Sequence, residues 1–134
     1  DITMAMNGAI AGLVAITASP SAPTAGAALM IGAVGGIIVY FSLIILDKRF
    51  GIDDPVGAIS AHGVVGIWGV MAVVFTGGSL FSQFAGVLAI AGFTYVMSLL
   101  TILIIDRFIS IRATDAEQEL GLDASEIGVK STTY

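Results

Sequence analysis

The sequence predicts an all-α membrane protein with four transmembrane helices. Apolar residues make up 57% of the 134 residues, charged residues make up only 11%, and the mean hydropathy is +1.01. A soluble domain carries about a quarter charged residues. Uncharged stretches at 26–46, 57–76 and 84–105 have about the 20 residues that a helix needs to cross the hydrocarbon core, and a shorter one lies at 2–17. None of them alternates strictly between apolar and polar residues, so strands of a membrane barrel are disfavoured.

The break between the second and third spans predicts a tight turn between two helices. Lys48 and Arg49 stand at the end of the second span, where basic side chains suit the negative end of the helix dipole. Gly51 follows as the expected C-cap of this helix. Asp54 and Pro55 are expected at the N-cap and at the first position of the next helix.

The basic residues predict which side of the membrane each end of the chain faces. The breaks at 19–23 and 77–79 carry no charge. Every basic residue lies in the middle break or after the fourth span: Lys48, Arg49, Arg107, Arg112 and Lys130. Because basic loops favour the cytoplasmic side, we expect both ends of the chain there. The transmembrane region is then 1–112, and 113–134 forms a cytoplasmic C-terminal tail.

Small residues recur at helical spacing in the predicted spans. They are Gly8 with Gly12, Gly32 with Gly36, and the three glycines Gly63, Gly66 and Gly69. Small residues let helix backbones approach closely in lipid, where little hydrophobic drive acts between helices. We expect ordinary bundle packing for most of these glycines and room for a narrow conduit beside a few.

His62 is the only histidine of the chain and lies inside the predicted third span. An ionisable group within a membrane is a functional candidate by default, because its burial in hydrocarbon is costly. On an α-helix it shares a face with a row of small or slim side chains: Ala58, Gly66, Gly69 and Val73. A neutral imidazole has one donor and one acceptor, so His62 could line a path for a small polar molecule or pass on a proton. The alternative is a buried histidine satisfied by a carbonyl or hydroxyl group of a neighbouring helix.

Several classes of function lack the residues that they need. The chain has no cysteine, a single histidine and no carboxylate within a predicted span, so no metal site is expected. A Ser-His-Asp hydrolase is unsupported because the acidic residues stand at helix ends, and we expect no enzyme. The formal net charge of -5 argues against nucleic acid as a partner.

The tail opens with a capping-box pattern. Glu117 follows Thr114 at the spacing of this motif, which predicts the start of a short helix, and Gly121 is its expected end. The acidic residues and the lack of a large apolar run mean that the tail cannot bury a core by itself. We expect it to dock on another surface or to stay mobile.

Three segments resemble the Amt/Rh family of ammonium transporters. Residues 52–69, which read IDDPVGAISAHGVVGIWG, closely resemble the segment that carries the second histidine of the family's twin-histidine pore motif. Residues 7–17 look like the family's eighth span, and residues 111–123 are similar to its cytoplasmic tail. The resemblance implies spans eight to eleven of an eleven-span fold with two inverted halves, usually assembled as a homotrimer.

The resemblance also implies roles for individual residues. His62 takes the position of the second pore histidine, and Ala58 takes a position on the pore wall. The first histidine would lie in the remaining N-terminal part of the transporter. Structural positions around the motif are Asp54, Pro55, Gly63 and Gly66.

The tail matches the family pattern in part. Arg112, Gly121 and Asp123 agree with it, whereas Ile127 stands where many relatives have a histidine. Ser125 aligns with a threonine that is phosphorylated in plant relatives, and the alternative is an ordinary solvent-facing serine. The resemblance suggests a PII-type signalling protein as a partner at the cytoplasmic face.

Taken together, the resemblance implies transport of ammonium or ammonia through the lipid bilayer of the plasma (inner) membrane. The path would be a narrow hydrophobic pore lined by a histidine pair, of which this chain supplies one, and no bound cofactor is expected. The sequence leaves a second interpretation open. A relative that does not transport could serve as an ammonium sensor or structural membrane subunit and signal through its tail.

Overall fold

In the computed structural model of the protein, residues 2–21, 23–122, 124–125 and 128 are described. Within these ranges every regular element is a helix, which confirms the predicted all-α class. The chain divides into two units, Asp1–Ile90 and Ala91–Tyr134, and each is described by itself.

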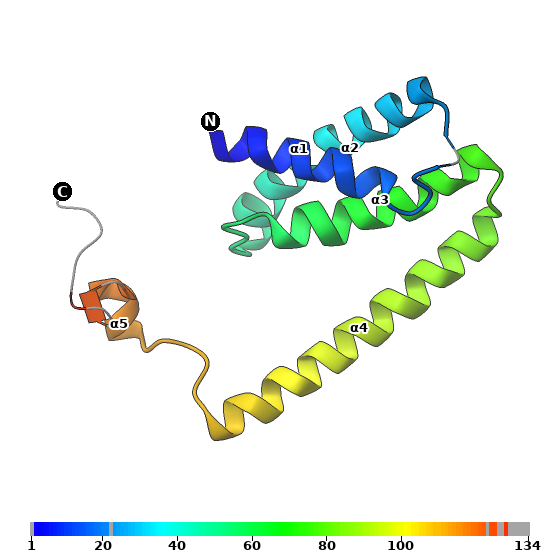
Figure 1. The fold of residues 1–134 in the computed structure, drawn as a ribbon. Helices are drawn as coiled ribbons and strands as arrows, with labels where there is room; N and C mark the ends of the chain where they lie inside the picture. The colour runs from blue at the N-terminus through cyan, green and yellow to red at the C-terminus, as the bar shows by residue number, and fades with distance from the viewer. Residues whose placement is uncertain (1, 22, 123, 126–127, 129–134) are drawn as a thin grey trace. The chain divides into compact units, whose positions relative to one another are not determined.

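The first unit is a bundle of three helical rods that lie side by side (Figure 1). The first rod is α1, Ile2–Ile16. The second is α2, Ala25–Ile45, which continues into a π-helical turn, η1, Leu46–Phe50. The third consists of a π-helix, an α-helix and a 3-10 helix in succession: η2, Ile59–Val64, α3, Val65–Ala72, and η3, Val73–Thr76.

A long helix, α4, Leu80–Phe108, begins in the first unit and continues into the second. It is followed by the short helix α5, Asp115–Leu120, in the tail. The second unit has no buried side chain among its described residues. Its apolar surface is therefore not covered by its own unit.

Within the part of the chain that the structure describes, three helical runs are long and apolar enough to cross a membrane. They are Ala25–Phe50 with 26 residues, Ile59–Thr76 with 18 and Leu80–Phe108 with 29. These runs overlap the stretches that hydropathy selected. The apolar helix α1 has 15 residues and is shorter than the roughly 20 that a span requires. A fourth crossing by α1 stays a prediction.

The two glycine pairs of α1 and α2 face each other. A Cβ built on Gly12 would lie 3.6 Å from the carbonyl oxygen of Gly32, and one built on Gly36 would lie 3.8 Å from the carbonyl oxygen of Gly8. Such short distances mean that the two backbones approach each other without side chains between them. The close helix contact expected from these glycines is present.

Ala15 is enclosed between the other two rods. A Cβ on Gly35 of α2 would lie 2.9 Å from the Ala15 side chain, and a Cβ on Gly69 of α3 would lie 2.8 Å from the Ala15 carbonyl oxygen. Neither glycine could carry a side chain without displacing α1. Around this point the buried apolar residues form one core: Ala11, Ala15, Ile31, Val39, Ala61, Val65 and Ala72.

We predict that Gly69→Ala destabilises the protein, whereas Gly66→Ala on the same helix does not. The added methyl group at Gly69 meets backbone that cannot rotate away, and overpacking of this kind costs about 1–3 kcal/mol. A Cβ at Gly66 meets nothing within 4 Å in the described residues. The measurement is the thermal unfolding midpoint of the purified protein in detergent. Equal midpoints for the two variants would contradict the close contact at Ala15.

Candidate functional site

The turn that leads into the third rod is built by two glycines and one carboxylate. Gly51 caps η1 in the left-handed conformation, with φ of +62°, and its N–H donates to the Asp47 carbonyl at 3.1 Å. This confirms its predicted role. Gly57 also has a positive φ, +71°, and its N–H donates to the Asp54 carbonyl at 3.0 Å. A residue with a Cβ rarely adopts this conformation.

Asp54 holds the start of the helix, but not in the predicted way. Its carboxylate accepts the backbone N–H groups of Ile59 at 3.0 Å and Ser60 at 2.9 Å. The π-helix begins only at Ile59, so the expectation that Pro55 occupies the first helical position is wrong. Pro55 lies in the turn instead. The reason is Gly57, whose left-handed backbone delays the helix.

The hydrogen bonds to Asp54 shift its pKa. Partial burial alone raises the pKa of this carboxyl group. Hydrogen bonds from Ser60, Ile59 and Ala58 stabilise the charged form and outweigh that effect, so the pKa lies below its ordinary value of 3.8. The charged carboxylate is therefore the form that caps the helix at neutral pH.

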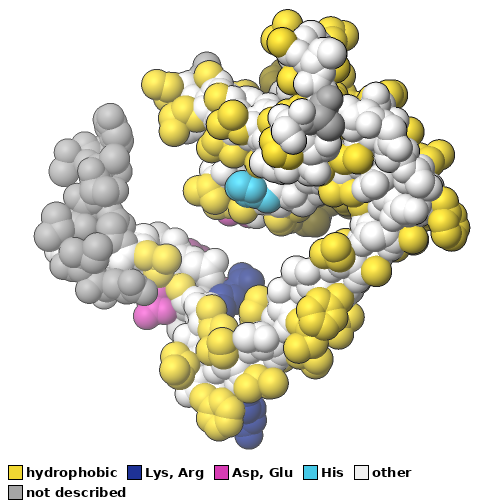
Figure 2. Space-filling model, turned by 45° about the vertical axis from the view of Figure 1, so that its right-hand side comes forward, with side chains coloured by type: hydrophobic (Ala, Val, Ile, Leu, Met, Phe, Trp, Pro, Cys, Tyr) yellow, Lys and Arg dark blue, Asp and Glu magenta, His cyan; other side chains and the backbone are white. Residues whose placement is uncertain are grey.

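His62 lies in the π-helix η2 and its side chain is exposed. Ala58 and Gly63 are exposed beside it. Among the described residues, the imidazole has no hydrogen-bond partner. The described part of the chain therefore provides no carbonyl or hydroxyl group of the kind that a purely structural histidine would use. Figure 2 shows the histidine at the surface, with apolar side chains nearby.

The face that His62 shares differs from the predicted one. Gly66 meets nothing within 4 Å and remains on an open side, but Gly69 turns toward Ala15 and is buried. An ideal α-helix would place His62 and Gly69 on one face. The π turn has more residues per turn and rotates the residues before it relative to those after it. His62 therefore lies on a different face of the rod from the buried residues of α3.

Polar contacts on the opposite face hold the third rod in its orientation. The Ser42 hydroxyl of α2 donates to the Ser60 hydroxyl at 2.9 Å. The Trp68 indole N–H donates to the Ile31 carbonyl at 3.1 Å. Ser60 is fully buried and completely paired within the described residues. These bonds fix the rotation of the helix that carries His62.

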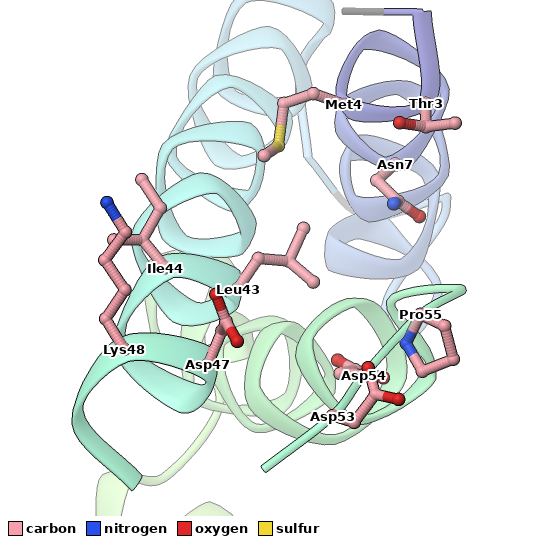
Figure 3. A pocket seen from close by; sticks show the side chains of 10 residues that line it. All are labelled: Thr3, Met4, Asn7, Leu43, Ile44, Asp47, Lys48, Asp53, Asp54 and Pro55. Atoms are coloured by element: carbon pink, nitrogen blue, oxygen red, sulfur yellow. The ribbon is translucent and has the colours of Figure 1, made fainter. Parts of the chain in front are cut away.

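A cavity of about 260 Å³ lies at the start of the third rod, between α1, the end of α2 and the turn (Figure 3). Its polar lining residues include Asn7 from α1, Asp47 and Lys48 from η1, and Asp53 and Asp54 from the turn. His62 does not line it. Within the described residues, no group of three His, Cys, Asp or Glu side chains is arranged to hold a metal ion.

Asn7 is the residue of this region that sequence reasoning missed. A Cβ on Gly57 would lie 2.7 Å from the Asn7 side-chain oxygen. Asn7 thus packs directly on the glycine that delays the helix. The available signal was a polar amide inside an otherwise apolar stretch, since such a group needs a polar or backbone neighbour in a membrane.

The tail residues form a separate small structure in the second unit. Thr114 and Glu117 make both bonds of the predicted capping box, and Gly121 ends the helix. The side chain and backbone of Thr114 donate to Glu117 and lower the pKa of its carboxyl group. Arg112 and Ser125 are exposed. Asp123 and Ile127 lie outside the described residues, so their predicted roles stay predictions.

Comparison with known proteins identifies the family of the chain. The sequence model of the Ammonium Transporter Family matches residues 1–132. The chain belongs to this family. The family is a transporter class and not an enzyme class, and the apolar helices of the chain agree with an integral membrane protein.

Individual relatives agree with this assignment. The chain is 33% identical to an ammonium transporter of Bacillus subtilis, with 95% of the chain and 36% of the relative covered. It is 34% identical to a putative ammonium transporter of Synechocystis, with 96% and 26% covered, and 33% identical to the ammonium transporter Amt2 of Archaeoglobus fulgidus, with 94% and 31% covered. The chain thus spans about a third of the length of the curated relatives it matches. No solved structure matches the chain.

We predict that Asp54→Asn lowers stability at neutral pH and removes part of the loss on acidification. Because the folded pKa lies below 3.8, the stabilisation is complete above that value and is lost as the pH falls through the folded pKa. Asparagine keeps only one of the two oxygens that accept the backbone N–H groups of Ile59 and Ser60, and loss of one hydrogen bond costs about 1 kcal/mol. Thermal unfolding between neutral pH and pH about 3 is the measurement. Asp53→Asn is the control, because Asp53 is exposed and accepts no hydrogen bond from the helix. A matching loss in that control would disprove the capping role of Asp54.

Proposed function

We propose that this chain forms one wall of a path by which ammonium or ammonia crosses the membrane, with His62 facing the path. The observation that carries the proposal is the exposed imidazole, which has no partner in the described residues and sits on an 18-residue apolar helical run. A polar group in that setting needs a polar neighbour. A narrow path, or a second histidine on its far side, supplies one.

The chemistry of the imidazole suits this substrate. Ammonium loses hydration when it enters an apolar passage, and a neutral imidazole nitrogen can accept a hydrogen bond or a proton from it. The ring does this without adding a fixed charge to the passage. Ala58 carries only a methyl group and Gly63 has no side chain, so both leave space beside His62. The family of the chain makes ammonium the substrate to test first.

The other wall of the path belongs to the rest of the transporter. We expect the first pore histidine there, and we expect a homotrimer with one path in each subunit. The basic residues at the ends of α2 and α4 favour the cytoplasmic side for both helix ends, and thus for the tail. The membrane would be the plasma (inner) membrane.

We predict that His62→Gln alters transport without unfolding the protein. Glutamine has similar bulk but cannot relay a proton, and loss of a proton-transferring group lowers rates by about a hundredfold or more. The measurement is ammonium-dependent current and uptake by the full-length protein in vesicles, with potassium as competitor. The control is Ile67→Leu, an exposed apolar substitution on the same helix.

Two results would decide against the pore role. A well-folded His62→Gln variant with unaltered current, uptake and selectivity would leave His62 as a structural residue. A wild-type protein that binds ammonium but carries none across the vesicle membrane would favour the sensor interpretation instead.

The tail would act by contact. Its capped helix exposes acidic side chains, including Asp115 and Glu119, that can meet basic cytoplasmic surfaces of its own or a neighbouring subunit. A PII-type signalling protein is a further partner to test at this face. The six-residue helix is too short to be stable without its cap or a docking surface.

We predict that deletion of 113–134 changes the transport rate or its regulation while the membrane part stays folded. Thr114→Ala should change the transport rate or its regulation in the same direction but to a smaller extent. It removes only the helix cap, which contributes about 1 kcal/mol. Uptake in vesicles and the thermal midpoint of the membrane part are the measurements. Unchanged rate and regulation in the deletion variant would refute a regulatory tail.

A further inference from the structure

The π-helical turn at the start of the third rod buries one side and turns the other outward. Ser60 and Val65 both expose 0% of their surface, whereas the residues at 62–64 between them are exposed. The Val65 N–H donates to the carbonyl of Ser60, five residues earlier, and to that of His62. In an α-helix each residue advances by about 100°, so residues five apart would lie about 140° apart. The π turn therefore places Ser60 and Val65 together on the packed side and His62 on the open side.

Ser60 is the residue by which this turn is held. Its backbone N–H donates to the Asp54 carboxylate at 2.9 Å, and its hydroxyl group donates to the same carboxylate. Its hydroxyl oxygen also accepts the proton of the Ser42 hydroxyl, with the two oxygens 2.9 Å apart. A hydroxyl group can donate one proton and accept another at the same time. The chain from Ser42 through Ser60 to Asp54 uses both functions and defines the rotation of Ser60.

The two serines lie in a contact whose other buried side chains are apolar. The buried residues of α2 are Ile31, Gly35 and Val39, and Ser42 follows Val39 on the same side of the helix. Among the described residues, Ser60 is the one buried polar side chain. Two alanines would also allow the helices to pack closely. A hydrogen bond differs from such packing because it holds only while the two groups face each other.

Of the two partners of Ser60, only Ser42 connects the turn to another helix. Asp54 is six residues from Ser60 in the same segment, so its carboxylate can move together with the turn. Ser42 belongs to α2 and cannot do so. The bond from Trp68 to α2 lies beyond the π turn and holds α3. The Ser42 hydroxyl therefore fixes the π turn relative to the bundle.

We propose that Ser42 is a positioning residue for transport, because its hydroxyl group holds the turn that directs His62 toward the path. The assignment rests on the function proposed above for His62. Ser42 is half-buried against the packed side of the third rod, whereas the imidazole is exposed on the other side. Ser42 therefore acts on transport only through the helix that it holds.

The experiment compares Ser42→Val with Ser42→Thr in the full-length protein in vesicles. Valine and threonine have nearly the same shape, and threonine keeps the hydroxyl group. Thr101→Val is the matched control, because the Thr101 hydroxyl donates to the Met97 carbonyl of its own helix, α4. Ammonium uptake, ammonium-dependent current and the charge moved per ammonium are measured, and the thermal midpoint checks folding. Ser42→Ala, which adds no bulk, replaces Ser42→Val if the valine variant does not fold.

We expect Ser42→Val to lower ammonium uptake about tenfold and to change the charge moved per ammonium. A displaced imidazole loses part of its contribution to proton transfer, which is about a hundredfold or more. Ser42→Thr should stay near the wild type in both measurements, and Thr101→Val should change neither. In the His62→Gln background, Ser42→Val should have no further effect. A purely structural role would instead lower uptake by the same factor in both backgrounds.

Three results would overturn the positioning role. They are wild-type uptake and charge ratio in a folded Ser42→Val variant, equal losses in Ser42→Thr and Ser42→Val, and the same loss from Ser42→Val in the His62→Gln background. Failure of the proposed function gives a different result, because His62→Gln alone would then transport like the wild type. An impaired His62→Gln variant beside an unimpaired Ser42→Val variant would remove only the role of Ser42.

Discussion

The close approach of three helix backbones around Ala15 is the constraint on which the first unit depends. Apolar helices surrounded by lipid gain little from hydrophobic burial, so short-range packing must hold them together. Gly35 and Gly69 permit it, because a Cβ on either would lie within 3 Å of Ala15. The places of α2 and α3 beside α1 therefore rest on one absent methyl group each, at Gly35 and Gly69. The direction in which His62 faces depends on the same contact.

Hydrogen bonds of polar groups fix the rotation of the third rod about its axis, which the glycine contacts alone do not set. The Asp54 carboxylate holds its first amides, and the Trp68 indole ties its middle to the Ile31 carbonyl of α2. Within the apolar span, the bond of the Trp68 indole has no water to compete with it. All these hydrogen bonds lie on the packed side of the third rod or at its start. The side that carries His62 is left free for the path that we propose.

Features that depend on nearby residues could be predicted from the sequence. Hydropathy located the long helices, since each is a continuous uncharged run, and local chemistry identified Gly51 as a helix cap. The error at Pro55 and the altered face of His62 have a different origin. A helical wheel assumes one period throughout, whereas the third rod contains a π turn, and the left-handed Gly57 before it packs against Asn7 from another helix. No local pattern encodes such contacts.

The π-helix η2 makes the number of residues before α3 as important as their identity. A π turn accommodates one residue more than an α turn. Loss of one residue within Ile59–Val64 would therefore be absorbed by a change from π-helix to α-helix, without breaking the rod. Asp54 on one side and the buried Val65 on the other would stay in place. A homologous chain that is one residue shorter there would turn a different side chain to the open face, so chain length at this point selects which group stands where His62 now does.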